Sequence, residues 1–282
     1  MTEGSRRRLA GSLVGAAALI TAVTVLSRIL GFVRWVAQAG TVGYDAVGTA
    51  YASANTVPNV LFEVVAGGAL AGALVPLLAV PLARGLRAET DRTASAALTW
   101  ALVALAPVAL LVLVLAEPVA RALAPDDPGT VELTATFLRI FALQVPLYGV
   151  GVVLSGVLQA QKRFFWPAFA PVLSTLVVLG AYGAFALTAD GRQGDPAALP
   201  DVAVAWLAWG TTAGVAAMSL PLLVPVRRSG VRLRPTLSFP DGVAARARRL
   251  AGAGVTALLA QQVAVVVTLR LAGTYGGTGT WP

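Results

Sequence analysis

The 282-residue chain contains neither cysteine nor histidine, and Lys162 is its only lysine. Without cysteine there are no disulfides or thiolate ligands, and without histidine there are no imidazole ligands or histidine proton relays. No grouping of acid, base and nucleophile stands out among the remaining residues. We therefore expect no enzyme: no catalytic residue, no bound metal and no cofactor.

Charged residues are also scarce, at 12% of the chain, while 57% of the residues are hydrophobic. A soluble domain of this length does not have such a composition. The net charge of +8 could suggest nucleic acid, but the charges lie in short segments between apolar stretches. The composition therefore predicts an all-α polytopic membrane protein with no nucleic-acid partner.

Seven apolar stretches are long enough to cross a hydrocarbon core, which takes about 20 helical residues. They lie at about 11–39, 50–82, 95–116, 131–160, 167–188, 201–226 and 250–272. Most arginines fall in alternate connecting segments, whereas the opposite segments hold only Arg121 and Arg192 among several carboxylates. By the positive-inside rule, this asymmetry predicts a multi-pass protein with a cytoplasmic N-terminus.

The first apolar stretch carries two arginines, Arg28 and Arg34, inside a predicted membrane span. A guanidinium within a membrane is costly, so it usually faces a cavity, an ion pair or a substrate. At the helical period, a wedge about 120° wide on this helix gathers most of its polar residues. These are Thr24, Ser27, Arg28, Gly31, Arg34, Trp35 and Gln38. The pattern predicts that one side of the helix faces a hydrated, anion-binding space.

The second stretch places Asn55, Asn59 and Glu63 on one helical face, with Glu63 near the middle of the span. Pro58, Gly67-Gly68 and Pro76 predict interruptions of this helix, which are tolerated in membranes where the freed backbone lines a cavity. Two alternatives remain open. Arg28 and Glu63 could form a structural ion pair, and Arg34 could extend to the membrane surface.

Several segments resemble the MurJ (MviN) lipid II flippase family, in the variant of its actinobacterial branch. The resemblance lies in Ser27-Arg28-Ile29-Leu30-Gly31-Phe32-Val33-Arg34, in Asn55-Thr56-Val57-Pro58-Asn59, and in Gln159-Ala160-Gln161-Lys162-Arg163-Phe164 with the following Pro167-Ala168-Phe169-Ala170-Pro171. Their order and spacing along the chain make the match fairly specific. Family members belong to the multidrug/oligosaccharidyl-lipid/polysaccharide exporter superfamily and have two six-helix lobes around a central cavity.

The resemblance implies a membrane transporter that moves lipid II, a peptidoglycan precursor, across the bacterial plasma membrane by alternating access, for cell-wall synthesis and cell shape. Its partners would be lipid II or a related polyprenyl diphosphate lipid, membrane lipids and cell-wall synthesis proteins. Arg28 and Arg34 match cavity arginines of the family. Phe62 and Glu63, in contrast, stand where many members have paired arginines. The substrate-binding residues we expect are Ser27, Arg28, Arg34, Asn55, Asn59 and Glu63.

Family members have about fourteen helices, so seven predicted spans imply an incomplete transporter. We expect a six-helix N-terminal lobe at residues 1–226, a basic cytoplasmic linker at 227–249, and the first helix of a C-terminal lobe at 250–282. Two other functions remain open: export of another polyprenyl-linked saccharide or a drug, and a non-transporting scaffold for cell-wall synthesis.

Overall fold

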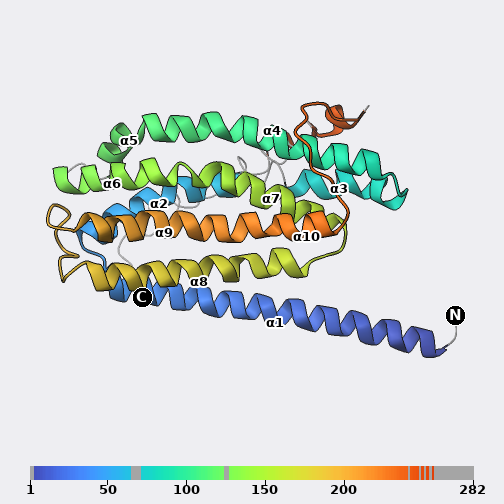
Figure 1. Cartoon of the computed structure of the whole chain (residues 1–282), viewed down its shortest axis with the longest axis horizontal. Coiled ribbons are helices and arrows are strands. Elements are labelled where there is room, and N and C mark those ends of the chain that lie inside the picture. The colour runs from blue at the N-terminus through green and yellow to red at the C-terminus, as the bar shows by residue number, and fades with distance from the viewer. Residues whose placement is uncertain are drawn as a thin grey trace, which may run out of the picture.

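The computed structural model describes residues 3–64, 71–123, 127–240, 242–247, 249–250, 252–253 and 256. The described chain is a bundle of helices lying side by side (Figure 1). The elements in order are α1 (Glu3–Thr41), α2 (Ala46–Val64), α3 (Ala71–Ala83), α4 (Arg87–Val114), α5 (Ala116–Leu123), α6 (Pro128–Phe141), α7 (Gln144–Ala160), α8 (Phe165–Thr188), α9 (Asp201–Ser219), the 3-10 helix η2 (Leu220–Leu222) and α10 (Leu223–Arg228). The protein is therefore an all-α polytopic membrane protein, as the composition predicts.

Five helical segments among the described residues are long and apolar enough to cross a membrane. They are Ala18–Thr41, Arg87–Val114, Pro128–Ala160, Phe165–Thr188 and Asp201–Arg228. All five overlap spans predicted from the sequence. The predicted span 50–82 corresponds to α2 and α3, on either side of the undescribed residues 65–70. The predicted span 250–272 lies almost entirely outside the described residues.

The prediction that Pro58 and Pro76 interrupt the helix of the second span is wrong for both prolines. Pro58 lies inside α2, and Pro76 lies inside α3. A proline removes one backbone donor, but neighbouring helices can satisfy the freed carbonyl in a membrane bundle. The predicted interruption at Gly67-Gly68 lies outside the described residues.

The helices pack around two large groups of buried apolar side chains. One group joins α2, α6, α8 and α9, and its centre is aromatic. There Tyr51 of α2 meets the rings of Phe137, Phe141 and Tyr182 with centroids 5.8 to 6.0 Å away. The second group joins α3, α4, α7 and α10. Helix α1 lies at the margin of the bundle and packs mainly on α8 (Figure 1).

Helix α6 begins at a well-formed cap outside the apolar core of the bundle. The Thr130 backbone N–H donates to Oδ2 of Asp127 at 2.9 Å, and the Thr130 hydroxyl donates to the same oxygen at 2.5 Å. Both hydrogen bonds stabilise the ionised carboxylate and lower the pKa of Asp127 below its ordinary value. Pro128 follows as the first helical residue, where its missing N–H costs nothing. This cap fixes the start of the apolar span formed by α6 and α7.

Candidate functional site

A polar hollow of about 440 Å³ lies between α1, α2, α7, α8 and α9, and we call it the Arg34 hollow. It is lined by Gly31, Arg34, Trp35, Gln38, Asn55, Asn59, Phe62, Tyr148, Ser174, Thr175, Val178, Thr211, Val215 and Met218. Two consecutive helices near the N-terminus and three consecutive helices from residue 144 onward thus contribute to one space. Polar side chains come from every one of these helices, which is unusual for surfaces within a membrane bundle unless they enclose a hydrated site.

A second hollow of about 620 Å³ lies between α1 and α8, and we call it the Arg28 hollow. It is lined by Thr24, Ser27, Arg28, Gly31, Phe32, Ala168, Pro171 and Thr175. Gly31 and Thr175 line both hollows, so the two spaces adjoin along α1 and α8. All seven residues of the polar wedge predicted on the first span line one or both of them.

The Arg34 side chain is half-buried, and a network of hydroxyl groups lies beside it. Its guanidinium is close to the hydroxyls of Tyr51 and Tyr182. Those two hydroxyls are 3.0 Å apart, and the Tyr182 hydroxyl donates to Oε1 of Gln38 at 3.2 Å. The Tyr51 hydroxyl also lies 2.8 Å from the hydroxyl of Thr211. Arg34 therefore lines a hollow of the bundle beside these hydroxyl groups, an arrangement that favours the cavity over extension to the membrane surface.

The asparagines of α2 face the same space as Arg34. Asn55 and Asn59 both line the Arg34 hollow, and Oδ1 of Asn59 accepts a hydrogen bond from the Tyr148 hydroxyl at 3.3 Å. Phe62 lies one turn further along α2 and packs on Tyr148 with ring centroids 4.5 Å apart. Asn59 is thereby oriented by α7, while Phe62 makes that end of the hollow apolar.

Glu63 is the predicted site residue that the structure separates from the others. Its side chain is exposed and lines neither hollow. Within the described part of the chain, no ion pair joins Arg28 to Glu63. The predicted contact rested on similar depths along two antiparallel spans, whereas α1 packs mainly on α8 and turns Arg28 toward that helix.

Sequence reasoning missed the contribution of α8 and α9. Ser174 and Thr175 line the site from α8, and Thr211 lines it from α9. Each is a polar residue in an otherwise apolar span, which is the signal that identified the wedge on the first span. Tyr51 and Tyr182 gave no such signal, because buried tyrosines are common in apolar cores.

Charge and geometry define what the two hollows could bind. Among the described residues that line them, Arg28 and Arg34 are the charged side chains, and no carboxylate faces them. A guanidinium binds two oxygens of a phosphate at once, and its strength increases where water is excluded. The remaining lining offers hydroxyl and amide groups for neutral polar parts of a ligand. The site is suited to a phosphate-bearing molecule entering from the membrane.

A multi-pass helical bundle with a cationic hollow between its helices is an arrangement typical of transporters. The fold is similar to a MOP superfamily transporter from Pyrococcus furiosus, with a TM-score of 0.71 over 93% of this chain and 56% of that one, at 16% sequence identity. Residues 38–280 match the family model of the lipid II flippase MurJ. The chain belongs to the MurJ lipid II flippase family.

Curated relatives agree with that assignment. The chain is 29% identical over 237 residues to a probable lipid II flippase MurJ of Rhizobium meliloti, covering 80% of this chain and 42% of the relative. It is 30% identical over 240 residues to the corresponding protein of Synechocystis, covering 81% and 43%. The chain thus spans about two fifths of the length of these relatives. The family and the apolar helices together define a multi-pass protein of the bacterial plasma membrane.

Proposed function

We propose that this chain supplies the arginine-bearing half of a lipid II flippase, which moves the lipid-linked peptidoglycan precursor across the plasma membrane. The observation that carries the proposal is the pair of adjoining hollows that contain Arg28 and Arg34 without a facing carboxylate. Membership of the family supports lipid II as the substrate. Lipid II bears a diphosphate, which two guanidinium groups on one helix face could bind together.

The two arginines have distinct positions in this proposal. Arg28 lies in the exposed hollow between α1 and α8, where a headgroup could arrive from the membrane. Arg34 lies six residues further along the same helix, deeper in the bundle and beside Tyr51 and Tyr182. Thr175 lies where the two hollows join, but its hydroxyl donates to the Pro171 carbonyl at 2.9 Å, so the two guanidinium groups would hold a diphosphate that passes from Arg28 to Arg34. Ser27, Asn55 and Asn59 would bind neutral polar groups, whereas Glu63 has no position in the hollows.

We further infer the domain arrangement and orientation. Residues 1–226 would form one lobe, 227–249 a cytoplasmic linker, and 250–282 the first helix of a second lobe. The N-terminus would be cytoplasmic, because the arginine-rich connections lie at the end of the bundle where α1 begins. Alternating access would then require rocking of this lobe against a second one, with the polyprenyl tail remaining in lipid.

Growth of a bacterium depleted of its own lipid II flippase tests the proposal. Two proteins would be expressed: the chain by itself, and a chimera in which the chain is joined to the C-terminal half of the Rhizobium meliloti relative. Membrane insertion of both would be checked by immunoblot. We expect rescue by the chimera. In that chimera, Arg34→Lys should reduce rescue by about tenfold or more in plating efficiency, since lysine does not bind phosphate bidentately.

Arg192→Lys is the matched control, because it makes the same change in the exposed connection between α8 and α9. It should leave rescue unchanged. A well-inserted chimera that never rescues would argue against lipid II and favour another polyprenyl-linked substrate or a scaffold. Full rescue by Arg28→Ala and Arg34→Lys would contradict the role given to the two hollows.

A further inference from the structure

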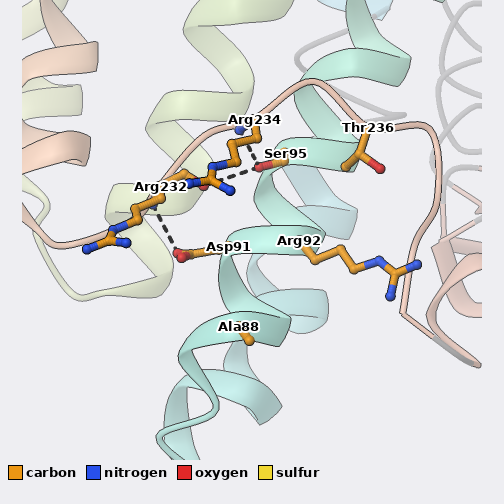
Figure 2. A pocket seen from close by; sticks show the side chains of 7 residues that line it. All are labelled: Ala88, Asp91, Arg92, Ser95, Arg232, Arg234 and Thr236. Carbon is orange, nitrogen blue, oxygen red and sulfur yellow. Dashed lines mark hydrogen bonds between the residues drawn. The ribbon is translucent and has the colours of Figure 1, made fainter.

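A separate basic site lies outside the two hollows, where the segment after α10 crosses α4. Residues 231–238 run in an extended conformation along the first half of α4 (Figures 1 and 2). Three backbone N–H groups of this segment donate to three α4 side chains. Arg232 donates to Oδ1 of Asp91 at 3.0 Å, Arg234 to Oγ of Ser95 at 3.0 Å, and Thr236 to Oγ1 of Thr99 at 3.1 Å.

The regular spacing of these bonds follows from the two backbone geometries. Asp91, Ser95 and Thr99 recur every four residues on one face of α4, a rise of about 6 Å per step. Alternate residues of an extended chain are about 6.6 Å apart. The two repeats match closely over the two steps that join these three bonds, so the helix face serves as a template for the segment. Trp100 and Arg92 add bonds to Leu237 and Ser238 near its end.

Alternation along the extended segment separates its side chains into two sets. Val231 is only 5% exposed and, with Leu233, packs on the apolar group of α3, α4, α7 and α10. Arg232 and Arg234 fall on the other side and are exposed. Because their backbone N–H groups are bonded to α4, the Cα positions of these two arginines are fixed on the bundle, so both side chains start from the same face of α4.

Arg232 and Arg234 line a hollow of about 360 Å³ with Arg92, Asp91, Ser95 and Thr236. Figure 2 shows the side chains of Arg92, Arg232 and Arg234 spread around this face of α4. Asp91 is the single carboxylate beside these three arginines, and it accepts its hydrogen bond from the backbone N–H of Arg232, while the guanidinium groups of Arg92 and Arg232 extend to opposite sides of the hollow. The hollow retains positive charge and free N–H donors, which suit a phosphate group.

The surroundings of the hollow indicate which phosphate it would take. Trp100 is 47% exposed and Leu237 is 56% exposed, so apolar surface adjoins the basic hollow. Tryptophan with a polar tip and an apolar body is typical of the membrane–water interface. Beyond Trp100, α4 exposes Leu102, Val103 and Leu110 along its length. A ligand with both a phosphate and acyl chains would match this arrangement better than a free anion.

We propose that Arg92, Arg232 and Arg234 form a binding site for the phosphate headgroup of an anionic membrane phospholipid, whose acyl chains lie along the exposed apolar face of α4. This site is independent of the Arg28 and Arg34 hollows and of lipid II. With the orientation proposed above, the lipid belongs to the cytoplasmic leaflet. Its occupancy would secure the extended segment on the lobe at the membrane surface.

Lipid binding to the purified chain in a neutral detergent, measured by native mass spectrometry, tests the site. The probes are dioctanoyl phosphatidylglycerol, dioctanoyl phosphatidylcholine and inorganic phosphate. We expect saturable binding of one phosphatidylglycerol, clearly preferred over phosphatidylcholine and not displaced by an equal concentration of phosphate. The double variant Arg232→Gln/Arg234→Gln should weaken that binding about 10- to 30-fold.

The matched control is Arg246→Gln/Arg249→Gln, which removes the same charge from exposed positions outside the hollow. It should bind phosphatidylglycerol as the unmodified chain does. Equal weakening in both double variants would overturn the proposal, because diffuse charge would then explain binding. Displacement by equimolar phosphate would overturn it in favour of a small-anion site. The backbone bonds to α4 survive these substitutions, and Arg234→Gln alone provides the same comparison if the double variant unfolds.

Discussion

At the scale of single residues, the position of Arg34 depends on hydroxyl groups that do not themselves carry charge. Gln38 of α1, Tyr51 of α2, Tyr182 of α8 and Thr211 of α9 are joined by hydrogen bonds in a buried cluster. Four helices thus meet at one polar point beside the guanidinium of Arg34. Within a membrane, such a cluster stabilises the fold only while each group has its partner.

Tyr182→Phe tests that dependence. Removing the hydroxyl leaves Oε1 of Gln38 without its donor and takes one partner from Tyr51, which should lower the free energy of unfolding by about 1 to 3 kcal/mol. Rescue by the chimera should fall as well, because Arg34 loses one of its two neighbouring hydroxyls. Thermal unfolding in detergent and plating efficiency measure the two effects.

The control for this change is Tyr44→Phe, since the Tyr44 side chain is 68% exposed at the loop after α1. It should alter neither stability nor rescue. If Tyr182→Phe behaves in the same way as Tyr44→Phe, the hydroxyl cluster does not position Arg34.

At the scale of residues, the sequence predicted which side chains share one face of a helix, but not which other helix that face contacts. The polar wedge on the first span was read correctly because helical periodicity fixes which residues share a face. The contact between Tyr51 and Tyr182 joins residues 131 positions apart, and periodicity carries no information about such pairs. The Arg28–Glu63 contact failed for the same reason, because the partner of a helix face is set by packing of the whole bundle.

At the scale of elements, the close packing of α8 on α9 positions the residues that these two helices contribute to the site. Helices α8 and α9 approach at Gly210 and Gly214, where an added Cβ would lie 2.2 Å from Cβ of Ala181 and 2.5 Å from Cγ2 of Val178. Small residues permit this approach, which is how helices commonly pack in membranes. The approach brings Thr211 beside Tyr51 and Thr175 toward the hollows.

Gly210→Ala should therefore separate α8 from α9 and destabilise the protein by about 1 to 3 kcal/mol, the usual cost of overpacking a core. The matched control is Gly183→Ala on α8, because no atom lies within 4 Å of the added Cβ there. That substitution should be neutral or slightly stabilising, since alanine favours a helix over glycine. Thermal unfolding of the two variants in one detergent gives the comparison, and equal midpoints would contradict the close packing.

The apolar stretches of the sequence predicted the membrane-spanning helices better than they predicted where helices end and how connecting segments pack. Five predicted spans correspond to long helical segments because a run of some 20 apolar residues has few other stable forms in a membrane. The prolines misled, since a proline inside a bundle can be accommodated without ending a helix. The extended segment on α4 was also unexpected: its template, Asp91, Ser95 and Thr99, is a polar helical face whose partner lies some 140 residues away.

At the scale of the whole molecule, the distribution of arginines makes a prediction about orientation. The connection between α7 and α8 contains Lys162 and Arg163, and it lies at the end of the bundle where α1 begins (Figure 1). The connection between α8 and α9 lies at the opposite end and carries Asp190 and Asp195 with Arg192. The positive-inside rule places the first connection in the cytoplasm and the second outside.

Because the chain has no cysteine, single cysteines can be introduced without removing others. Arg163→Cys and Ala198→Cys are both at exposed positions, in the two connections at opposite ends of α8. A membrane-impermeant maleimide applied to intact spheroplasts should modify Ala198→Cys and leave Arg163→Cys unmodified, whereas permeabilised cells should show both modified. The reverse pattern would place the N-terminus outside. It would also move the lipid site of Arg92, Arg232 and Arg234 to the outer leaflet. The Arg28 and Arg34 hollows would then have to bind lipid II in a bundle whose orientation is opposite to the one proposed.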